Sequence, residues 1–282
     1  MAQPAVIFIL STNYSGSHLL AQLLAAHSRC ASVGELHNYR KFTRRISRSG
    51  NVAHDYLSSS LFAGLDSLPE NTWHRTIFER LQLRDPQASH LIDNSKRVQW
   101  VRAVQASCAS HVLLLRDPRA LVSRWLRTYS GPRQEQRQRR RLLRRRPWWL
   151  GRLDDPVDLY LHKWLLANTR LRRFVAGSPS AATLTYRDLV VRTEPTLTDL
   201  MPRLGLAFEP GQLRYGTAGT VLGTRKRDYV QHAARSEIVP DLRWQHDLTP
   251  AQQARIVGNR ALRHFLAQDR LRMVEDGLTR HL

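Results

Sequence analysis

Residues 5–10 read AVIFIL, and the stretch SGSHLL follows at residues 15–20. The apolar run at 6–10 is typical of a parallel strand buried on both faces, and the leucines beyond Gly16 recur at helical spacing. The small and hydroxyl residues between them allow two interpretations. One is an ordinary tight connection; the other is a cradle for an anion, because backbone N–H groups at a helix start favour negative charge. The nucleotide-kinase pattern G-x-x-x-x-G-K-[ST] is absent.

Further apolar runs alternate with helical patterns along the chain. Strands are predicted at residues 90–93, 111–115 and 181–186, and helices at about 96–109, from Pro118 onward, at 157–176, at 188–204 and from Pro250 to about 266. This alternation predicts the α/β class, with a central, mainly parallel sheet flanked by helices on both faces. Ligands of such sheets bind at the carboxyl ends of the strands, where the turns after Leu10 and Leu115 lie.

Composition narrows the class of protein. With 282 residues, 42% of them apolar, the chain can bury a sizeable core, and we expect one domain over residues 1–282. Two cysteines, Cys30 and Cys108, are too few for a disulfide scaffold or a cysteine zinc site. The N-terminal apolar run is too short for a signal peptide or a membrane span. We therefore expect a cytoplasmic protein.

The formal net charge is +21, and only four of the 44 basic residues are lysines. Arginine presents a planar fork to phosphate, sulfate or carboxylate, so this charge favours anionic ligands. Two basic segments, at about 40–60 and 133–149, are expected as loops or flaps. The second, RQEQRQRRRLLRRRP with Trp148 and Trp149 behind it, is either a solvated helix face or a flap over an acidic substrate.

The stretch LLLRDPRALVSRWL, at residues 113–126, carries a second anion motif. Arg116 closes a strand, and Asp117 caps a helix that begins with Pro118. Ser123 lies about two turns along, on the same side as Arg116, so that a guanidinium and a hydroxyl face one phosphate. The alternative is that Arg116 pairs with a carboxylate and Ser123 faces a helix.

With these motifs in this order, the sequence resembles the sulfotransferases that use 3′-phosphoadenosine-5′-phosphosulfate (PAPS), especially the bacterial branch and the Golgi tyrosylprotein and carbohydrate enzymes. Residues 14–39 resemble the 5′-phosphosulfate loop, its helix and the Gly-Glu element, and 113–126 resemble the 3′-phosphate motif. LIDNSKRVQW at 91–100 resembles an element of the intervening strand. LGTRKRDYV at 222–230 and PDLRW at 240–244 resemble the element that closes over the nucleotide. The resemblance implies a P-loop-like three-layer α/β/α fold.

The resemblance also implies which residues bind PAPS. The 5′-phosphosulfate site would comprise Tyr14, Ser15, Gly16, Ser17, His18 and Leu19. The 3′-phosphate would be held by Arg116 and Ser123, with further contacts to it or its ribose from Arg225, Lys226 and Arg227.

Sulfuryl transfer has a loose, in-line transition state, so catalysis is mainly positioning and charge stabilisation. Glu35 matches the family's base and suits this role if its pocket raises its pKa; the alternative is a helix cap or an ion pair. Lys96, with Ser95 beside it, matches the group that stabilises the departing oxygen, the alternative being a surface residue. The histidines show no metal-ligand spacing, and no metal is expected.

Three positions depart from the family pattern. Tyr14 stands where many relatives have Arg or Lys, so Lys96 or an arginine of the basic segment must supply that charge. His18 replaces a common Ser or Thr, and Gly223-Thr224 replaces a common Gly-Asn pair.

The leading prediction is therefore transfer of a sulfuryl group from PAPS, without a metal, to a hydroxyl of a small-molecule, glycan or lipid acceptor. A nucleic-acid or polyanion binder would explain the arginines, but not why both anion motifs follow strands. A P-loop nucleotide kinase lacks its lysine after Gly16. No specific nucleic-acid partner is expected.

Overall fold

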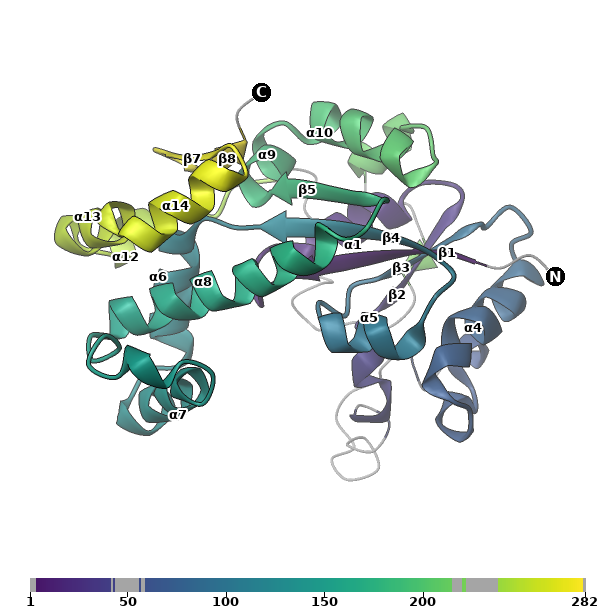
Figure 1. The fold of residues 1–282 in the computed structure, drawn as a ribbon. Helices are drawn as coiled ribbons and strands as arrows, with labels where there is room; N and C mark the ends of the chain where they lie inside the picture. Colours follow the sequence, from purple (N-terminus) through teal and green to yellow (C-terminus); the bar gives the residue numbers. More distant parts are fainter. Residues whose placement is uncertain are drawn as a thin grey trace.

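A parallel sheet forms the centre of the protein (Figure 1). The computed structural model describes residues 4–41, 43, 56, 59–214, 220–221 and 238–280. The six strands lie in the order β5-β4-β1-β3-β2-β6, and every pairing is parallel. Their bounds are β1 Ala5–Ser11, β2 Cys30–Gly34, β3 His90–Asp93, β4 Cys108–Leu115, β5 Ala181–Thr185 and β6 Thr220–Val221.

Helices cover both faces of the sheet. They are α1 Ser17–Ala25, α4 Trp73–Gln82, α5 Val98–Val104, α6 Pro118–Thr128, α7 Pro132–Leu143, α8 Pro156–Val175, α9 Tyr186–Val191, α10 Thr193–Leu200, α12 Trp244–Asp247, α13 Pro250–Gly258 and α14 Arg260–Gln268. A hairpin of β7 Leu271–Val274 and β8 Gly277–Arg280 follows. Short 3₁₀ turns connect the elements, at Leu36–Asn38, Ser60–Phe62, Leu65–Ser67, Glu70–Thr72, Pro147–Trp149, Met201–Leu204 and Pro210–Arg214.

Strand β1 explains the three layers. Its successive side chains point to opposite faces, so Val6, Phe8 and Leu10 join one core, with α4, α5, α6 and α8. Ile7 and Ile9 join the other core, with α1, α9 and α10. The predicted α/β/α architecture with a central parallel sheet is confirmed.

Several predicted boundaries were wrong. The helix expected to reach residue 109 ends at Val104, where Gln105 adopts a left-handed φ of 46°, and β4 then begins at Cys108. The helix expected at 188–204 breaks at Arg192 into α9 and α10. The helix expected from Pro250 to 266 breaks at Asn259, whose side chain accepts from the amide of Leu262 and so starts α14.

The arginine-rich run folds as helix α7. Only Gln138 and Leu142 of this helix are buried, so its arginines form a solvated face, one of the two interpretations of the sequence. Lys163 of α8 holds α7 in place, with its Nζ 3.2 Å from Gln138 Oε1. Of the other basic segment, at about 40–60, most residues lie outside the described part of the chain.

The turn between β1 and α1 requires a glycine at position 16. Gly16 has a φ of +90°, and a Cβ there would lie 2.5 Å from the ring of Tyr186. Tyr186 follows β5, so the loop after β1 is packed against the end of another strand. Only a residue without a side chain fits both constraints.

Replacing Gly16 by Ala tests this packing. The left-handed φ alone costs roughly 1–2 kcal/mol, and the clash with Tyr186 should add about 1–3 kcal/mol. Gly205→Ala is the matched control, because Gly205 has a φ of +76° but nothing within 4 Å of its Cβ position. Denaturant unfolding should show the larger loss of stability for Gly16→Ala. Equal losses would mean that Tyr186 moves aside without cost.

Candidate active site

Five strands deliver one residue each to the same edge of the sheet. Thr12 follows β1, Glu35 follows β2, Asn94 follows β3, Arg116 follows β4 and Tyr186 follows β5. The carboxyl ends of parallel strands form the usual ligand site of such folds. Of the residues singled out from the sequence, Glu35 and Arg116 each follow a strand at this edge.

The β1–α1 loop (residues 12–16) is stabilised by a hydrogen bond between two of its own side chains. Ser15 and Ser17 are buried, and Ser15 Oγ lies 2.7 Å from Thr12 Oγ1. The first amide of α1 with an intrahelical acceptor is that of Leu20, bonded to Gly16 O, so the amides before it lack helical acceptors. The Ser15 hydroxyl thus bonds within the loop, and the backbone N–H groups before Leu20 are left without intrahelical acceptors.

Glu35, after β2, and Lys96, after β3, form a cluster of polar side chains with His18. Lys96 Nζ donates a short hydrogen bond to Glu35 Oε1 and lies 3.3 Å from His18 Nε2. His18 Nε2 is 3.1 Å from the same carboxylate oxygen, and Asn38 Nδ2 donates to Glu35 Oε2 at 2.7 Å. The other ring nitrogen of His18 meets Asn94 Nδ2 at 2.7 Å. His18 is thereby oriented from both sides.

The pKa of Glu35 follows from these neighbours. Burial alone would raise the pKa of this carboxyl, but the hydrogen bond with His18 and the charge of Lys96 outweigh burial and lower it below its ordinary value of 4.5. The expectation of a raised pKa is therefore not met in this arrangement. In this structure Glu35 forms an ion pair with Lys96, which is one of the alternatives to a role as base.

Asp93 fixes the backbone that carries Lys96. This fully buried carboxylate accepts from the amide of Ser95 at 2.8 Å, from Ser95 Oγ, and from Trp100 Nε1 at 2.7 Å. His74 Nε2 lies 2.9 Å from its second oxygen. The loop so held places Lys96 at a left-handed φ of 63°. Ser95 is buried and serves this scaffold, and neither Asp93 nor His74 was singled out as a site residue from the sequence.

His37 is a further functional candidate that the sequence left unassigned. Both of its ring nitrogens are buried, without a hydrogen-bond partner among the described residues, and its amide donates to Ser95 Oγ at 3.2 Å. Burial, followed by the charge of Arg97, lowers the pKa of His37 to about 4. The ring is therefore neutral near pH 7 and able to accept a proton.

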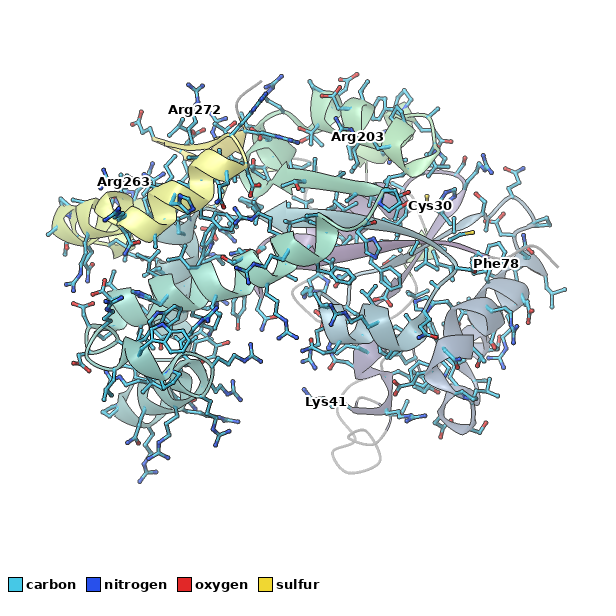
Figure 2. The ribbon with its side chains drawn as sticks, in the orientation of Figure 1. Cys30, Lys41, Phe78, Arg203, Arg263 and Arg272 are labelled. Atoms are coloured by element: carbon cyan, nitrogen blue, oxygen red, sulfur yellow. The ribbon has the colours of Figure 1, made fainter. Side chains whose placement is uncertain are left out.

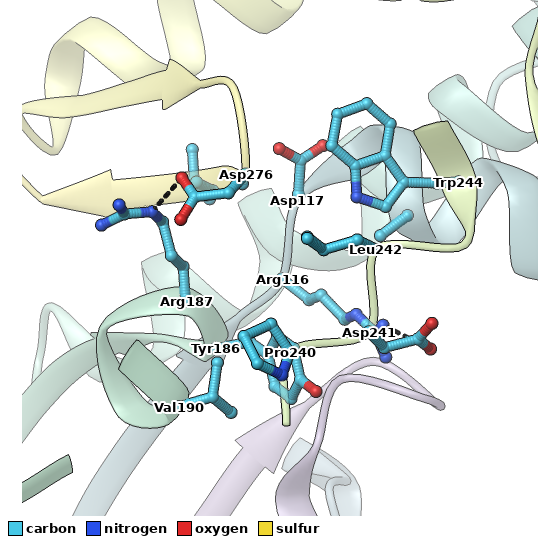
Figure 3. A pocket seen from close by; sticks show the side chains of 13 residues that line it. Arg116, Asp117, Tyr186, Arg187, Val190, Pro240, Asp241, Leu242, Trp244 and Asp276 are labelled. Carbon is cyan, nitrogen blue, oxygen red and sulfur yellow. Dashed lines mark hydrogen bonds and ion pairs between the residues drawn. The ribbon is translucent and has the colours of Figure 1, made fainter. Parts of the chain in front are cut away.

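Arg116 lies among residues that follow β5 and residues of the late segment 240–244, as Figure 3 shows for Tyr186, Pro240 and Asp241. Its guanidinium donates to the backbone oxygen of Tyr14 at 2.7 Å and to Asp241 Oδ2 at 2.9 Å, and lies 4.4 Å from the ring centroid of Tyr186. Its Nε is buried without a partner among the described residues. The segment with Pro240 and Asp241 lies across it and leaves a cavity of only about 10 Å³.

Carboxylates of the same late segment pair with both residues of the predicted 3′-phosphate motif. Ser123 is buried and donates to Asp247 Oδ2 at 2.7 Å. The hydrogen bond from Arg243, together with the charge of Arg116, lowers the pKa of Asp241 despite its burial. In the described residues Arg116 therefore pairs with a carboxylate and Ser123 faces a helix, α12, which is the alternative to a phosphate site. PDLRW does close over Arg116; Arg225, Lys226 and Arg227 lie outside the described residues.

A cation also stands at Tyr14. The guanidinium of Arg124, in α6, lies 4.7 Å from the centroid of the Tyr14 ring. Arg124 is half-buried, and Tyr14 is 38% exposed with a φ of 71°. Arg124, the residue after Ser123, thus places a positive charge next to Tyr14. In the sequence, Arg124 was visible only as the residue after Ser123 in the stretch VSRW at 122–125.

The described residues contain neither a cluster of metal ligands nor a membrane-spanning helix. No group of three or more His, Cys, Asp and Glu side chains converges there as a metal site would. No helix in the described part combines the length and apolar character needed to cross a membrane.

The Glu35–Lys96 pair predicts a pH dependence of stability. Because the pKa of Glu35 is lower in the folded chain than its ordinary 4.5, its ionised form stabilises the fold above that pH, and this contribution is lost on further acidification. The difference in unfolding free energy between wild type and Glu35→Gln should therefore shrink from pH 7 to pH 3. Glu275→Gln, at an exposed glutamate, is the control. A difference that grows on acidification would contradict the lowered pKa.

Comparison with known proteins agrees with this geometry. Residues 4–210 match the model of the sulfotransferase family, and no curated protein sequence matches the chain. The sulfotransferase domain from the curacin biosynthetic pathway is 21% identical with a TM-score of 0.56, over 92% of this chain and 98% of that one. The sulfotransferase domain from the Synechococcus PCC 7002 olefin synthase is 21% identical with a TM-score of 0.57, over 94% and 96% of the two chains. These structures share the fold of this chain. Because the family model matches more than half of its length, the chain belongs to the sulfotransferase family.

Proposed function

We propose that the protein transfers a sulfuryl group from PAPS to a hydroxyl of a small-molecule, glycan or lipid acceptor. One observation carries the proposal: the hydrogen bond of 2.7 Å from Arg116 to Tyr14 O joins the anion-binding turns after β1 and β4. Two such turns side by side suit a nucleotide with phosphate groups at both ends of its ribose. Family membership supports the same reaction.

The residues at these turns fit PAPS. The first N–H groups of α1, before Leu20, have no intrahelical acceptor and would bind a phosphate. The buried Nε of Arg116 lacks a partner among the described residues and is available to an anion. Backbone amides at the start of α1 would hold the 5′-phosphosulfate, with Arg124 beside Tyr14 adding charge. The 3′-phosphate would take the place of Asp241 on Arg116.

The catalytic groups are those after β2 and β3. PAPS, when bound, supplies a sulfuryl group on a phosphate oxygen, and Lys96 and the loop amides would offset the charge on that oxygen as it departs. Glu35 would accept the proton of the acceptor hydroxyl. Once Lys96 engages the departing oxygen, Glu35 loses its nearest positive charge, and its pKa rises toward the range a general base needs.

His37 is the second candidate for the base, because its ring is neutral and has no hydrogen-bond partner among the described residues, and its backbone amide donates to Ser95 Oγ. The proposal includes action without a metal, as one domain, in the cytoplasm. Binding of a polyanion remains an alternative function, favoured by the exposed arginines of α7, and it predicts affinity that falls steeply with salt.

Nucleotide binding tests the donor site. The product 3′-phosphoadenosine-5′-phosphate (PAP), at about 100 times its Kd, should stabilise the wild type by roughly 2.7 kcal/mol in thermal unfolding, and PAP should bind more tightly than AMP. Arg116→Ala should remove most of the preference for PAP, whereas Arg124→Gln should weaken PAP and AMP by the same factor, about tenfold. Equal binding of PAP and AMP by the wild type would reject the 3′-phosphate site.

Turnover of PAPS tests the base. Glu35→Gln should lower kcat about 100-fold or more while the Kd for PAP changes little, measured with the acceptor identified by a turnover screen. His37→Gln is the matched comparison, because His37 lies two residues from Glu35 and its amide bonds Ser95 Oγ. A larger loss of kcat in His37→Gln than in Glu35→Gln would assign the base to His37 instead.

A further inference from the structure

A basic groove lies apart from the strand-end site, between α5 and the second half of α8. Its volume is about 410 Å³, within the range of small-molecule sites. Both helices belong to the same layer over the sheet, visible in Figure 1. Its rim is made of Arg102, Arg145, Arg146, Arg170 and Arg173.

The charge of this groove is not balanced. No acidic residue lines it, and no ion pair joins any of its five arginines to a carboxylate of the described residues, whereas arginines elsewhere, such as Arg116, Arg187 and Arg255, do pair. Like charges gathered around one concavity repel one another and raise its positive potential. A multiply charged anion in the groove would relieve that repulsion.

The floor of the groove is apolar. Val98, Leu166 and Phe174 line it, and the guanidinium of Arg102 lies 5.6 Å from the ring centroid of Phe174. A fully hydrated polyanion would leave this surface uncovered, while an uncharged apolar ligand would leave five guanidinium groups unneutralised. The lining therefore suits a ligand that has both characters.

We propose that this groove binds an anionic amphiphile, a compound with an apolar ring or chain that carries several sulfate, phosphate or carboxylate groups. Arginine forks bind such groups through paired, charge-assisted hydrogen bonds, and the apolar part covers Leu166 and Phe174. The site is separate from the β1–α1 loop and from Arg116. It holds whether or not the chain transfers sulfate.

Pyranine (8-hydroxypyrene-1,3,6-trisulfonate) is a suitable fluorescent probe, because it joins an aromatic body to three sulfonates. Its anisotropy, titrated with the full chain at physiological salt, should report binding that is weakened at least about tenfold in the double variant Arg170→Glu/Arg173→Glu. The matched control is Arg260→Glu/Arg263→Glu, which makes the same charge change at the same spacing on α14, where both arginines are exposed (Arg263 is labelled in Figure 2). The control should bind pyranine nearly as the wild type does.

Two further measurements separate this site from its rivals. Leu166→Ser should weaken pyranine several-fold but leave the affinity for tripolyphosphate unchanged, because only pyranine covers the apolar floor. Saturating PAP should leave pyranine bound. Equal losses in the two double variants, displacement by PAP, or no effect of Leu166→Ser on pyranine would each overturn the proposal; circular dichroism establishes that the variants are folded.

Discussion

Arg116 holds the backbone of Tyr14 through a hydrogen bond of 2.7 Å, and the site depends on this contact. The bond fixes the loop after β1 to the first residue after β4. It forms because β1 and β4 pair in parallel from Ala5 with Cys108 to Ser11 with Leu114, so both strands end at the same level. The two anion-binding turns are adjacent for this reason, although 102 residues separate Arg116 from Tyr14.

Both principal cations of the site are paired with carboxylates. Lys96 pairs with Glu35, and Arg116 pairs with Asp241, all four groups being largely shielded from water. A buried ion pair gains little net stability, but removal of one partner leaves an uncompensated charge. An anionic ligand that binds Lys96 or Arg116 would therefore have to compete with Glu35 or Asp241 rather than meet an unpaired cation.

The features that could be predicted from the sequence are those set by short local patterns. The strand and turn at β1, the capped start of α6 at Asp117 and the position of Lys96 after a strand follow from patterns within a few residues. Strand β2, which Glu35 follows, was not predicted, and Glu35 was identified only through the resemblance. Contacts made by distant segments were not readable in this way. The pairing of Arg116 with Asp241 spans 125 residues, and no local pattern showed that Asp241, rather than a ligand, meets this guanidinium in the folded chain.

Arg124 makes a second contact between the crossover after β4 and Tyr14. A tyrosine ring offers its face to a cation, and α6 carries Arg124 to that face because the helix starts directly after Arg116. Arg116 holds the Tyr14 backbone while Arg124 covers its ring, so one continuous segment, residues 116–124, sets both the place of the loop and its charge. The loop after β1 and the crossover after β4 are therefore held together by two independent contacts, one to the Tyr14 backbone and one to its ring.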